Sequence, residues 1–529
     1  MRKILLVLAL ALCGSAFAQY ETHWPEYNYH QFAGGGSAAV YAYIQIDERF
    51  ITAEDNYAAL EIAAFVGDEC RGHEFVIDET SYGDYYPHVQ IGISYPENGT
   101  GAAVTFKLYD HENNLEYDNC ISSVEIFTGD EHDELVYGPD NVVVLNFISP
   151  SLELTVESYT ENGGYYLIAP PFGDVDPDNV TNMIPTSGGY DLYRFNQSAP
   201  ANEQGITLEW ENYKADKFTS LEPGKGYLYA REEGATLTFK GTPITGDTYD
   251  VSLVYDNGEN VELPGWNLIG NPFATEATLN MPYYRLNGDG SEVKATTEAT
   301  DINAIEGVFV HTDAAGTATF TKGTGSKSSQ TVSLNLLRND RSASLIDRAI
   351  VRFDQGGQLP KLMLDPTNTR VYIPQNGTDY AVATCSDDNI MPVSFKAKEN
   401  GSYTLKVSIE NVEMGYLHLI DNKTGNDVDL LATPSYTFNA SRLDYANRFS
   451  LVYATTTGLS ENFAFFNGSN WFVSNEGKAI IQVVDLTGRI LSSESISGNA
   501  EISLSPTAGI YMLRLINGDN VKTQKVVVR

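Results

Sequence analysis

The stretch AIIQVVDLTGRIL, residues 479–491, decides how this chain folds. Four of its first seven residues are Ile or Val, which favour a β-strand. Residues 485–489 contain the Asp and Gly that tight turns require, and residues 490–491 are apolar again. A strand, a turn and a second strand predict a β-hairpin.

The alternation of apolar runs and turns continues from this hairpin to the C-terminus. Residues 510–515 and 525–528 are two further apolar runs, and Gly, Asn and Asp separate them. We therefore expect residues 458–529 to form a small Ig-like β-sandwich.

Three motifs in this region resemble those of a known family. They are Val484-Asp485-Leu486-Thr487-Gly488-Arg489, Gly509-Ile510-Tyr511-Met512-Leu513-Arg514 and Lys522-Thr523-Gln524-Lys525-Val526-Val527-Val528. They are similar to the motifs of the type A sorting domain of the type IX secretion system, which belongs to the Bacteroidetes. The Pro-Asn-Pro segment that often opens such domains is absent, and Glu461-Asn462-Phe463-Ala464 stands in its place.

The resemblance implies an export route and a destination. It assigns the sorting motif to Asp485, Gly488, Arg489, Gly509, Tyr511, Lys522 and Lys525. It implies that the type IX machinery carries the chain across the outer membrane, and that the sorting domain is then removed. It also implies attachment to a surface lipopolysaccharide, so the expected location is the outside of the outer membrane.

The N-terminus predicts a cleavable signal peptide over residues 1–18. Arg2 and Lys3 precede an apolar run at residues 4–12, and the small-x-small sequence Ala16-Phe17-Ala18 follows. Cleavage is expected before Gln19. No later stretch reaches the roughly 18 consecutive apolar residues of a membrane helix, so we expect no membrane span.

Composition indicates a folded, strongly acidic protein. The 529 residues include 70 acidic and 33 basic side chains, which gives a formal net charge of −37. Because such a field repels phosphate groups, we expect no nucleic-acid partner. The 42% hydrophobic content is sufficient for several cores, and the length predicts several domains.

The spacing of apolar runs predicts an all-β chain. Short runs rich in Val, Ile, Tyr and Phe are interrupted every roughly 8–12 residues by Gly, Asn, Asp or Pro, which is typical of β-sandwiches. We expect several β-sandwich or jelly-roll-like domains in series. The expected divisions are an N-terminal β-sandwich at 19–150, duplicated β-units at 151–325, a β-sandwich at 331–454 and the sorting domain at 458–529. In the first division, the clearest strands are expected at 39–46, 58–66, 103–109 and 141–148.

An internal duplication occupies the middle of the chain. GYYLIAPPF at 164–172 matches GWNLIGNPF at 265–273, and two later pairs of segments match in the same order. These are YDLYRFN at 190–196 with YYRLN at 283–287, and EPGKGYLY at 222–229 with IEGVFV at 305–310. The repetition predicts two copies of one β-unit, at about 155–242 and 255–323, that can pack as one pseudo-symmetric domain.

Catalytic signatures are scarce. HExxH, GxSxG, P-loop and CxxC motifs are all absent. Cys385 lies in ATCSD, which matches no cysteine-peptidase signature, so we interpret it as a buried thiol. Cys70 and Cys120 lie in one expected domain, and an oxidising compartment allows either a disulfide between them or two free thiols.

Two sets of residues are candidates for binding. Asp174, Asp176 and Asp178 alternate as calcium ligands do, but the Gly and the late Glu of an EF-hand are missing, so the preferred interpretation is an exposed acidic turn and a calcium site is the alternative. No other cofactor is expected. The second set is Tyr82, Tyr85 and Tyr86, which could form a platform for an unidentified glycan or protein ligand or could simply cap a β-core.

We therefore expect a non-catalytic, multi-domain surface protein that serves adhesion or ligand binding. The alternative is a secreted hydrolase, a peptidase or a glycosidase, because such enzymes commonly carry the same tail. A structural component of a surface layer is a third interpretation.

Overall fold

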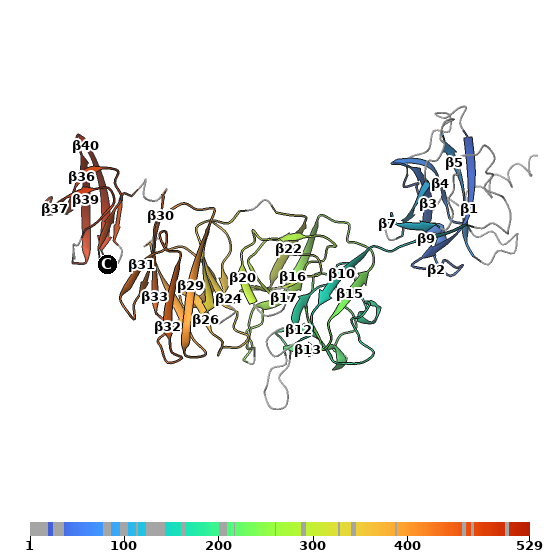
Figure 1. Ribbon diagram of the computed structural model, residues 1–529, viewed down its shortest axis with the longest axis horizontal. Coiled ribbons are helices and arrows are strands. Elements are labelled where there is room, and N and C mark those ends of the chain that lie inside the picture. Colours follow the sequence, from blue (N-terminus) through green and yellow to red (C-terminus); the bar gives the residue numbers. More distant parts are fainter. Residues whose placement is uncertain are drawn as a thin grey trace, which may run out of the picture.

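The computed structural model describes residues 20–24, 36–77, 86–95, 104–112, 115–122, 143–159, 164–199, 209–215, 217–259, 261–286, 293–325, 328–339, 345–386, 389–456, 462–466, 470–502 and 507–528. Within these ranges the helical elements are short 3-10 turns, η2 (Tyr57–Ala59), η4 (Pro177–Asn179) and η5 (Tyr213–Ala215), and strands form the rest of the regular structure. Figure 1 shows separate β-sheets following one another along the long axis. The predicted all-β fold is confirmed. The described residues contain no helix that is long and apolar enough to cross a membrane.

Two packed sheets form the N-terminal part of the molecule. One has the order β2-β1-β9-β8, with β5 pairing with the same edge of β1 as β2, and the other has the order β4-β3-β6-β7. Because neighbouring side chains of a strand point to opposite faces, Val40, Ala42 and Ile44 are buried between the sheets while Tyr41 and Tyr43 point away. The strands are β1 (Gly36–Ile46), β2 (Arg49–Phe50), β3 (Leu60–Val66), β4 (Glu69–Phe75), β5 (His88–Tyr95), β6 (Val104–Asp110), β7 (Leu115–Tyr117), β8 (Cys120–Ser122) and β9 (Val143–Phe147).

The middle of the molecule holds two β-units with the same topology. The sheet β11-β14-β12-β13 in the first unit has the same order as β17-β21-β19-β20 in the second, and in each unit a separate small sheet pairs the opening strand with the closing one. The first unit consists of β10 (Ser151–Val156), β11 (Tyr165–Ile168), β12 (Tyr190–Phe195), β13 (Trp210–Asn212), β14 (Tyr227–Arg231) and β15 (Ala235–Lys240). The second consists of β16 (Thr248–Leu253), β17 (Trp266–Gly270), β18 (Ala277–Leu279), β19 (Tyr283–Leu286), β20 (Val293–Thr296), β21 (Gly307–His311) and β22 (Gly316–Lys322).

The two units contact each other reciprocally. The backbone N–H of Ala169 donates to the carbonyl of Ile305 at 3.0 Å, and the equivalent N–H of Gly270 donates to the carbonyl of Gly224 at 3.0 Å. Two isolated bridges are related in the same way, Ile168 with Glu306 and Ile269 with Lys225. Reciprocal contacts are the mark of a two-fold arrangement, so the units form a pseudo-symmetric pair.

One long, folded sheet forms the next domain. Its strand order is β31-β30-β33-β28-β26-β27-β24-β23-β29-β32, with β25 on β27, and Leu334, Phe395 and Leu419 lie in the core that it encloses. The strands are β23 (Thr331–Arg338), β24 (Leu345–Arg352), β25 (Leu359–Pro360), β26 (Arg370–Gln375), β27 (Thr378–Thr384), β28 (Ile390–Lys396), β29 (Gly401–Glu410), β30 (Met414–Asp421), β31 (Asn426–Asp429), β32 (Ser435–Ala440) and β33 (Phe449–Thr455).

This domain is joined to the β-unit pair by a shared core. Ile350 and Leu362 pack in one cluster with Tyr284 and other residues of the pair. The guanidinium of Arg352 donates to both carboxylate oxygens of Glu298, at 3.1 and 2.9 Å. Apolar burial together with a bidentate ion pair makes this a rigid junction.

Two small sheets form the C-terminal domain. β37-β36-β39-β40 packs on β34-β35-β38, and Trp471 and Leu513 lie in the core between them. The strands are β34 (Ala464–Phe466), β35 (Trp471–Val473), β36 (Lys478–Asp485), β37 (Ile490–Ser497), β38 (Ala500–Ile502), β39 (Gly509–Asn517) and β40 (Asn520–Val528). The hairpin expected at 479–491 is β36 and β37.

Candidate functional site

The C-terminal domain carries every residue of the predicted sorting motif, and Asp485 organises the first part of it. Its Oδ1 accepts hydrogen bonds from the backbone N–H of Thr487 at 2.9 Å, the Thr487 hydroxyl at 2.6 Å and the backbone N–H of Arg489 at 3.0 Å. These bonds, the Thr487 hydroxyl first, lower the pKa of Asp485. Gly488 has a φ of 87°, which a residue with a Cβ rarely adopts. The Asp–Gly–Arg motif therefore sets the tight turn between β36 and β37.

Gly509 and Tyr511 lie at the start of β39, where Tyr511 is the cross-strand partner of Asp485. The Tyr511 ring lies in the domain core, and its hydroxyl donates to the carbonyl of Thr507 at 2.6 Å. A buried tyrosine whose hydroxyl has a partner is stably placed. This part of the motif is also structural.

The two lysines of the motif lie on opposite faces of β40. Lys525 is opposite Met512, whereas Lys522 is opposite the buried Leu515. Lys525 therefore lies on the outer face of the four-stranded sheet. Lys522 lies on the face that carries the core, but near the β39–β40 turn, where the sheet extends beyond the core and leaves it exposed. The two lysines are three residues apart on one strand, so the alternation of side chains places them on opposite faces.

The outer face of this sheet is apolar and basic. Its cross-strand rows are Ile480, Ile516 and Val521; Gln482, Arg514 and Thr523; Val484, Met512 and Lys525; and Ile510 with Val527. Ile480, Val521 and Val527 are 41, 49 and 58% exposed. None of these positions is acidic, although the chain has 70 acidic residues. Exposed apolar side chains gathered on one face, as Ile480, Val521 and Val527 are here, are typical of an interaction site.

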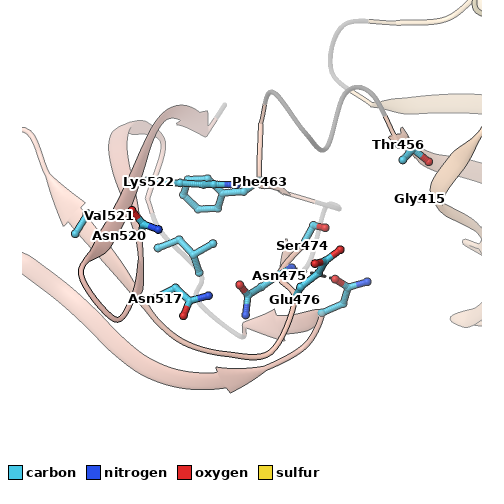
Figure 2. A pocket seen from close by; sticks show the side chains of 12 residues that line it. Gly415, Thr456, Phe463, Ser474, Asn475, Glu476, Asn517, Asn520, Val521 and Lys522 are labelled. Atoms are coloured by element: carbon cyan, nitrogen blue, oxygen red, sulfur yellow. Dashed lines mark hydrogen bonds between the residues drawn. The ribbon is translucent and has the colours of Figure 1, made fainter.

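A polar cleft of about 840 Å³ lies at the end of the domain that carries the β39–β40 turn, where Val521 of the outer face also lines it. Figure 2 shows Lys522 and Phe463 at one end of it, with Asn475 and Asn517 among the lining side chains. Gly415 and Thr456 of the preceding domain complete the lining. The cleft thus lies at the junction through which the chain enters the C-terminal domain.

Aromatic contacts dock the C-terminal domain against the preceding one. The ring of Tyr416 lies 5.1 Å from that of Phe465 and 4.5 Å from that of Phe472, measured between centroids. The Tyr416 hydroxyl also donates to Glu501 Oε1 at 3.2 Å. These contacts close one side of the junction.

The structure does not bring the two predicted disulfide partners together. Cys70 and Cys120 are both free thiols, on β4 and β8 of different sheets. Cys120 packs against the core between the sheets, and Cys70 packs on a separate cluster that contains Trp24. Burial raises the pKa of Cys120 to about 12, which disfavours the reactive thiolate.

The three predicted calcium ligands lie at a short 3-10 turn. Asp176 caps η4, because its Oδ1 accepts the backbone N–H of Asp178 at 3.0 Å. Within the described ranges, no three His, Cys, Asp or Glu side chains are grouped to hold a metal ion, and Asp174, Asp176 and Asp178 are included in that statement. The acidic-turn interpretation accounts for Asp176 and Asp178.

The remaining predicted residues are only partly visible. Tyr82, Tyr85 and the predicted signal peptide lie outside the described residues. Tyr86 stacks on Phe50 at a centroid distance of 4.6 Å. The sequence reasoning missed the outer-face residues Arg514 and Gln482, although the alternation along β36 and β39 could have revealed them.

Comparison with known proteins agrees with this domain. Residues 469–529 match the family model described as a secretion system C-terminal sorting domain. No curated protein matches the chain. The resemblance to a type IX secretion sorting domain is therefore confirmed, and this domain supports export of the chain by that system.

Proposed function

We propose that this type IX cargo is a non-catalytic, multi-domain surface protein that serves adhesion or ligand binding. The observation that carries the proposal is the sorting domain, whose turn and core are built from its motif and whose outer face is apolar and basic. The signal peptide at 1–18 would be removed before Gln19. The sorting domain would be removed after export, and the cargo would be attached to a surface lipopolysaccharide outside the outer membrane.

A structural role for the buried charges supports the non-catalytic part of the proposal. Arg448 pairs with Asp421 at 2.9 Å, and Lys361 pairs with Asp347 at 2.5 Å. All four side chains are buried, so they pair with each other inside the β-domain rather than meeting a substrate. Catalytic groups need access to the reacting atoms.

Deletion of residues 458–529 tests the export route. We expect the shortened chain to remain in the periplasm, because nothing then engages the machinery. Cell fractionation and surface proteolysis measure the distribution, and circular dichroism confirms that the shortened chain stays folded. Surface display equal to that of the full chain would refute the sorting role.

Two charge reversals test the outer face itself. Lys525→Glu places an acid beside Met512 and Val484, so we expect surface display to fall about tenfold, because reversing the charge of a basic contact is unfavourable and about 1.4 kcal/mol corresponds to a factor of ten. Lys322→Glu changes the net charge equally at an exposed position of β22, outside the sorting domain, and it is the matched control. Equal losses in both variants would mean that total charge, and not this face, matters.

A substrate screen separates this proposal from a secreted hydrolase. The mature chain is incubated with peptide and glycoside substrates of broad specificity. We expect no turnover above that of the buffer. Robust turnover that persists through repurification would replace the adhesion proposal with the hydrolase one.

A further inference from the structure

The N-terminal sandwich, whose strands are blue in Figure 1, has a row of aromatic rings on one outer sheet face. Tyr41 and Tyr43 are alternate residues of β1 and point away from the core. Phe50 on β2 is opposite Gln45 and joins the same face. His88 on β5 is opposite Tyr43. We refer to Tyr41, Tyr43, Phe50, Tyr86 and His88 as the aromatic face.

The rings of the aromatic face contact one another continuously. Tyr41 stacks on His88 with centroids 4.5 Å apart, and Tyr41 and Tyr43 meet edge to face at 6.1 Å. Tyr43 then contacts Tyr86 at 5.9 Å, and Tyr86 stacks on Phe50 at 4.6 Å. Each contact falls within the roughly 4.5–7 Å range of favourable aromatic pairs, so the rings hold one another in a fixed arrangement.

These rings are not the core of the sandwich. The core lies on the opposite side of the same strands, where Val40, Ala42, Ile44 and Ile91 are at most 1% exposed. The rings of Tyr41, Tyr43, Phe50 and Tyr86 remain partly exposed. A sheet that needed only a covered core would favour polar or charged residues at these outward positions.

Amide side chains flank the rings, and charges are missing. Gln90 is exposed and lies opposite Tyr41, while Gln45 and Asn146 are paired across β1 and β9. The other outward positions are Val144 and Ile121, so the described face has no Asp, Glu, Lys or Arg. Beside it, Arg49 is neutralised by Asp55 through two hydrogen bonds of 3.0 Å.

We propose that the aromatic face binds a neutral polysaccharide chain. The apolar C–H face of a pyranose ring packs on an aromatic ring, and its hydroxyls pair with amide side chains, which both donate and accept. A formal charge of −37, with no charged side chain at the described positions of this face, fits an uncharged ligand and disfavours an ionic one. The proposal rests on the proposed function, because it names the ligand class of the exported binding protein.

The geometry also favours an extended ligand. Outward residues of one strand are separated by roughly 7 Å, so Tyr41 and Tyr43 present successive rings along β1. Phe50 and Tyr86 continue the row beyond Tyr43. Several sugar units in line can therefore stack at once.

Binding to named polysaccharides tests the proposal. The mature chain is run in native gels that contain xylan, mannan, starch or laminarin, with the acidic polymer polygalacturonate as the comparison. We expect at least one neutral polymer to retard the protein and polygalacturonate not to do so. Tyr43→Ala should weaken the retardation about tenfold, whereas Tyr43→Phe, which keeps the ring, should retain it.

Two further variants keep the result interpretable. Tyr445→Ala removes a tyrosine that is 93% exposed in another domain, so it should leave retardation unchanged. Gln90→Ala removes an amide without removing a ring, and it should also weaken binding. It therefore tests the face even if Tyr43→Ala does not fold. Thermal melting checks each variant.

Some outcomes would overturn the proposal. They are no retardation by any neutral polymer, retardation by polygalacturonate alone, equal effects of Tyr43→Ala and Tyr445→Ala in folded proteins, and capture of a protein partner by this face without a glycan. Each of these would leave export and surface display intact. Failure of the ligand proposal is therefore distinguishable from failure of the proposed function.

Discussion

Glu61 shows how one buried carboxylate holds the start of the described chain to the first domain. It lies on β3 with no exposed surface, and its Oε2 accepts the backbone N–H of His23 at 2.8 Å. His111 Nε2 is 2.8 Å from the same oxygen, and His73 Nδ1 is 2.8 Å from Oε1. Burial raises the pKa of Glu61, but the hydrogen bonds from His73, His23 and His111 together outweigh it, and the pKa is lowered.

Replacing this carboxylate should weaken the N-terminal sandwich. Glu61→Gln leaves the two imidazoles without an anion, so we expect the free energy of unfolding to fall by about 3 kcal/mol. Since the folded pKa lies below the unfolded value, Glu61 contributes stability above about pH 4.3 and loses it as the pH falls through the folded pKa. Calorimetry of the mature chain and of Glu61→Gln, at pH values above and below about 4.3, measures the loss of unfolding free energy and its dependence on pH.

The exposed Glu54 supplies the control for that experiment. Glu54→Gln, in the loop before η2, should leave the first transition unchanged. A Glu61→Gln protein with the same transition temperature and the same acid sensitivity as the parent would show that the carboxylate does not hold the segment.

At the scale of the elements, two glycines set how closely the repeated β-units approach. A Cβ on Gly226 would lie 2.6 Å from the carbonyl oxygen of Ile269, and one on Gly307 would lie 3.0 Å from that of Ile168. These are equivalent positions seen from the two sides of the pseudo-two-fold arrangement. Backbone lies against backbone here, so a side chain cannot be accommodated by rotation.

Alanine at either position should therefore lower the free energy of unfolding, and the shorter contact should give the larger loss. We expect Gly226→Ala to lower the free energy of unfolding of the pair by about 1–3 kcal/mol and Gly307→Ala by less, because its contact is longer. Gly316→Ala, where the nearest atom would be 3.8 Å away, is the control. Chemical denaturation monitored by tryptophan fluorescence provides the measurement. Equal stability of Gly226→Ala and Gly316→Ala would contradict the close-packed interface.

At the scale of the whole molecule, charge is segregated. Residues 19–457 contain 64 acidic and 25 basic side chains, whereas residues 458–529 contain six of each. The acidic side chains of the cargo therefore repel one another, while the sorting domain has no net charge. A sorting domain with no net charge lets its outer face approach a partner without the repulsion that the acidic cargo would produce.

Salt should stabilise such a cargo. Raising the ionic strength from about 0.01 to 1 M shortens the Debye length from roughly 30 to 3 Å, which screens the repulsion among the acidic groups. We expect the melting temperature of the mature chain to rise with sodium chloride, because the buried ion pairs are screened much less. A melting temperature that falls with salt would show that favourable surface ion pairs outweigh the repulsion.

Local elements were predictable because neighbouring residues decide them. The run 39–46 and the run 103–109 correspond to β1 and β6, and 141–148 contains β9. The strand expected at 58–66 begins only at Leu60, because residues 57–59 form the 3-10 turn η2, in which Ala59 N–H bonds to Asn56 O. Asp485 and Gly488 identified their turn through their own backbone chemistry.

The candidate sites were less predictable because register and distant contacts decide them. The sequence predicts an aromatic platform at Tyr82, Tyr85 and Tyr86, yet the rings that gather around Tyr86 come from β1 and β2, more than thirty residues earlier. The residues next to Glu61 in the sequence do not predict its contacts with His23 and His111, which lie 38 and 50 residues away in the chain.

The sequence by itself determined the β character of the chain, its acidic cargo, its duplicated middle and the sorting identity of its end, since each is written in local pattern, composition or repetition. Only the tertiary structure decided that Lys525 faces outward while Lys522 faces a cleft, that the β-units meet reciprocally, and that rings from separate strands form one face. The physical reason is register. Pairing between strands places residues far apart in the chain side by side, and a shift of one residue would reverse every face.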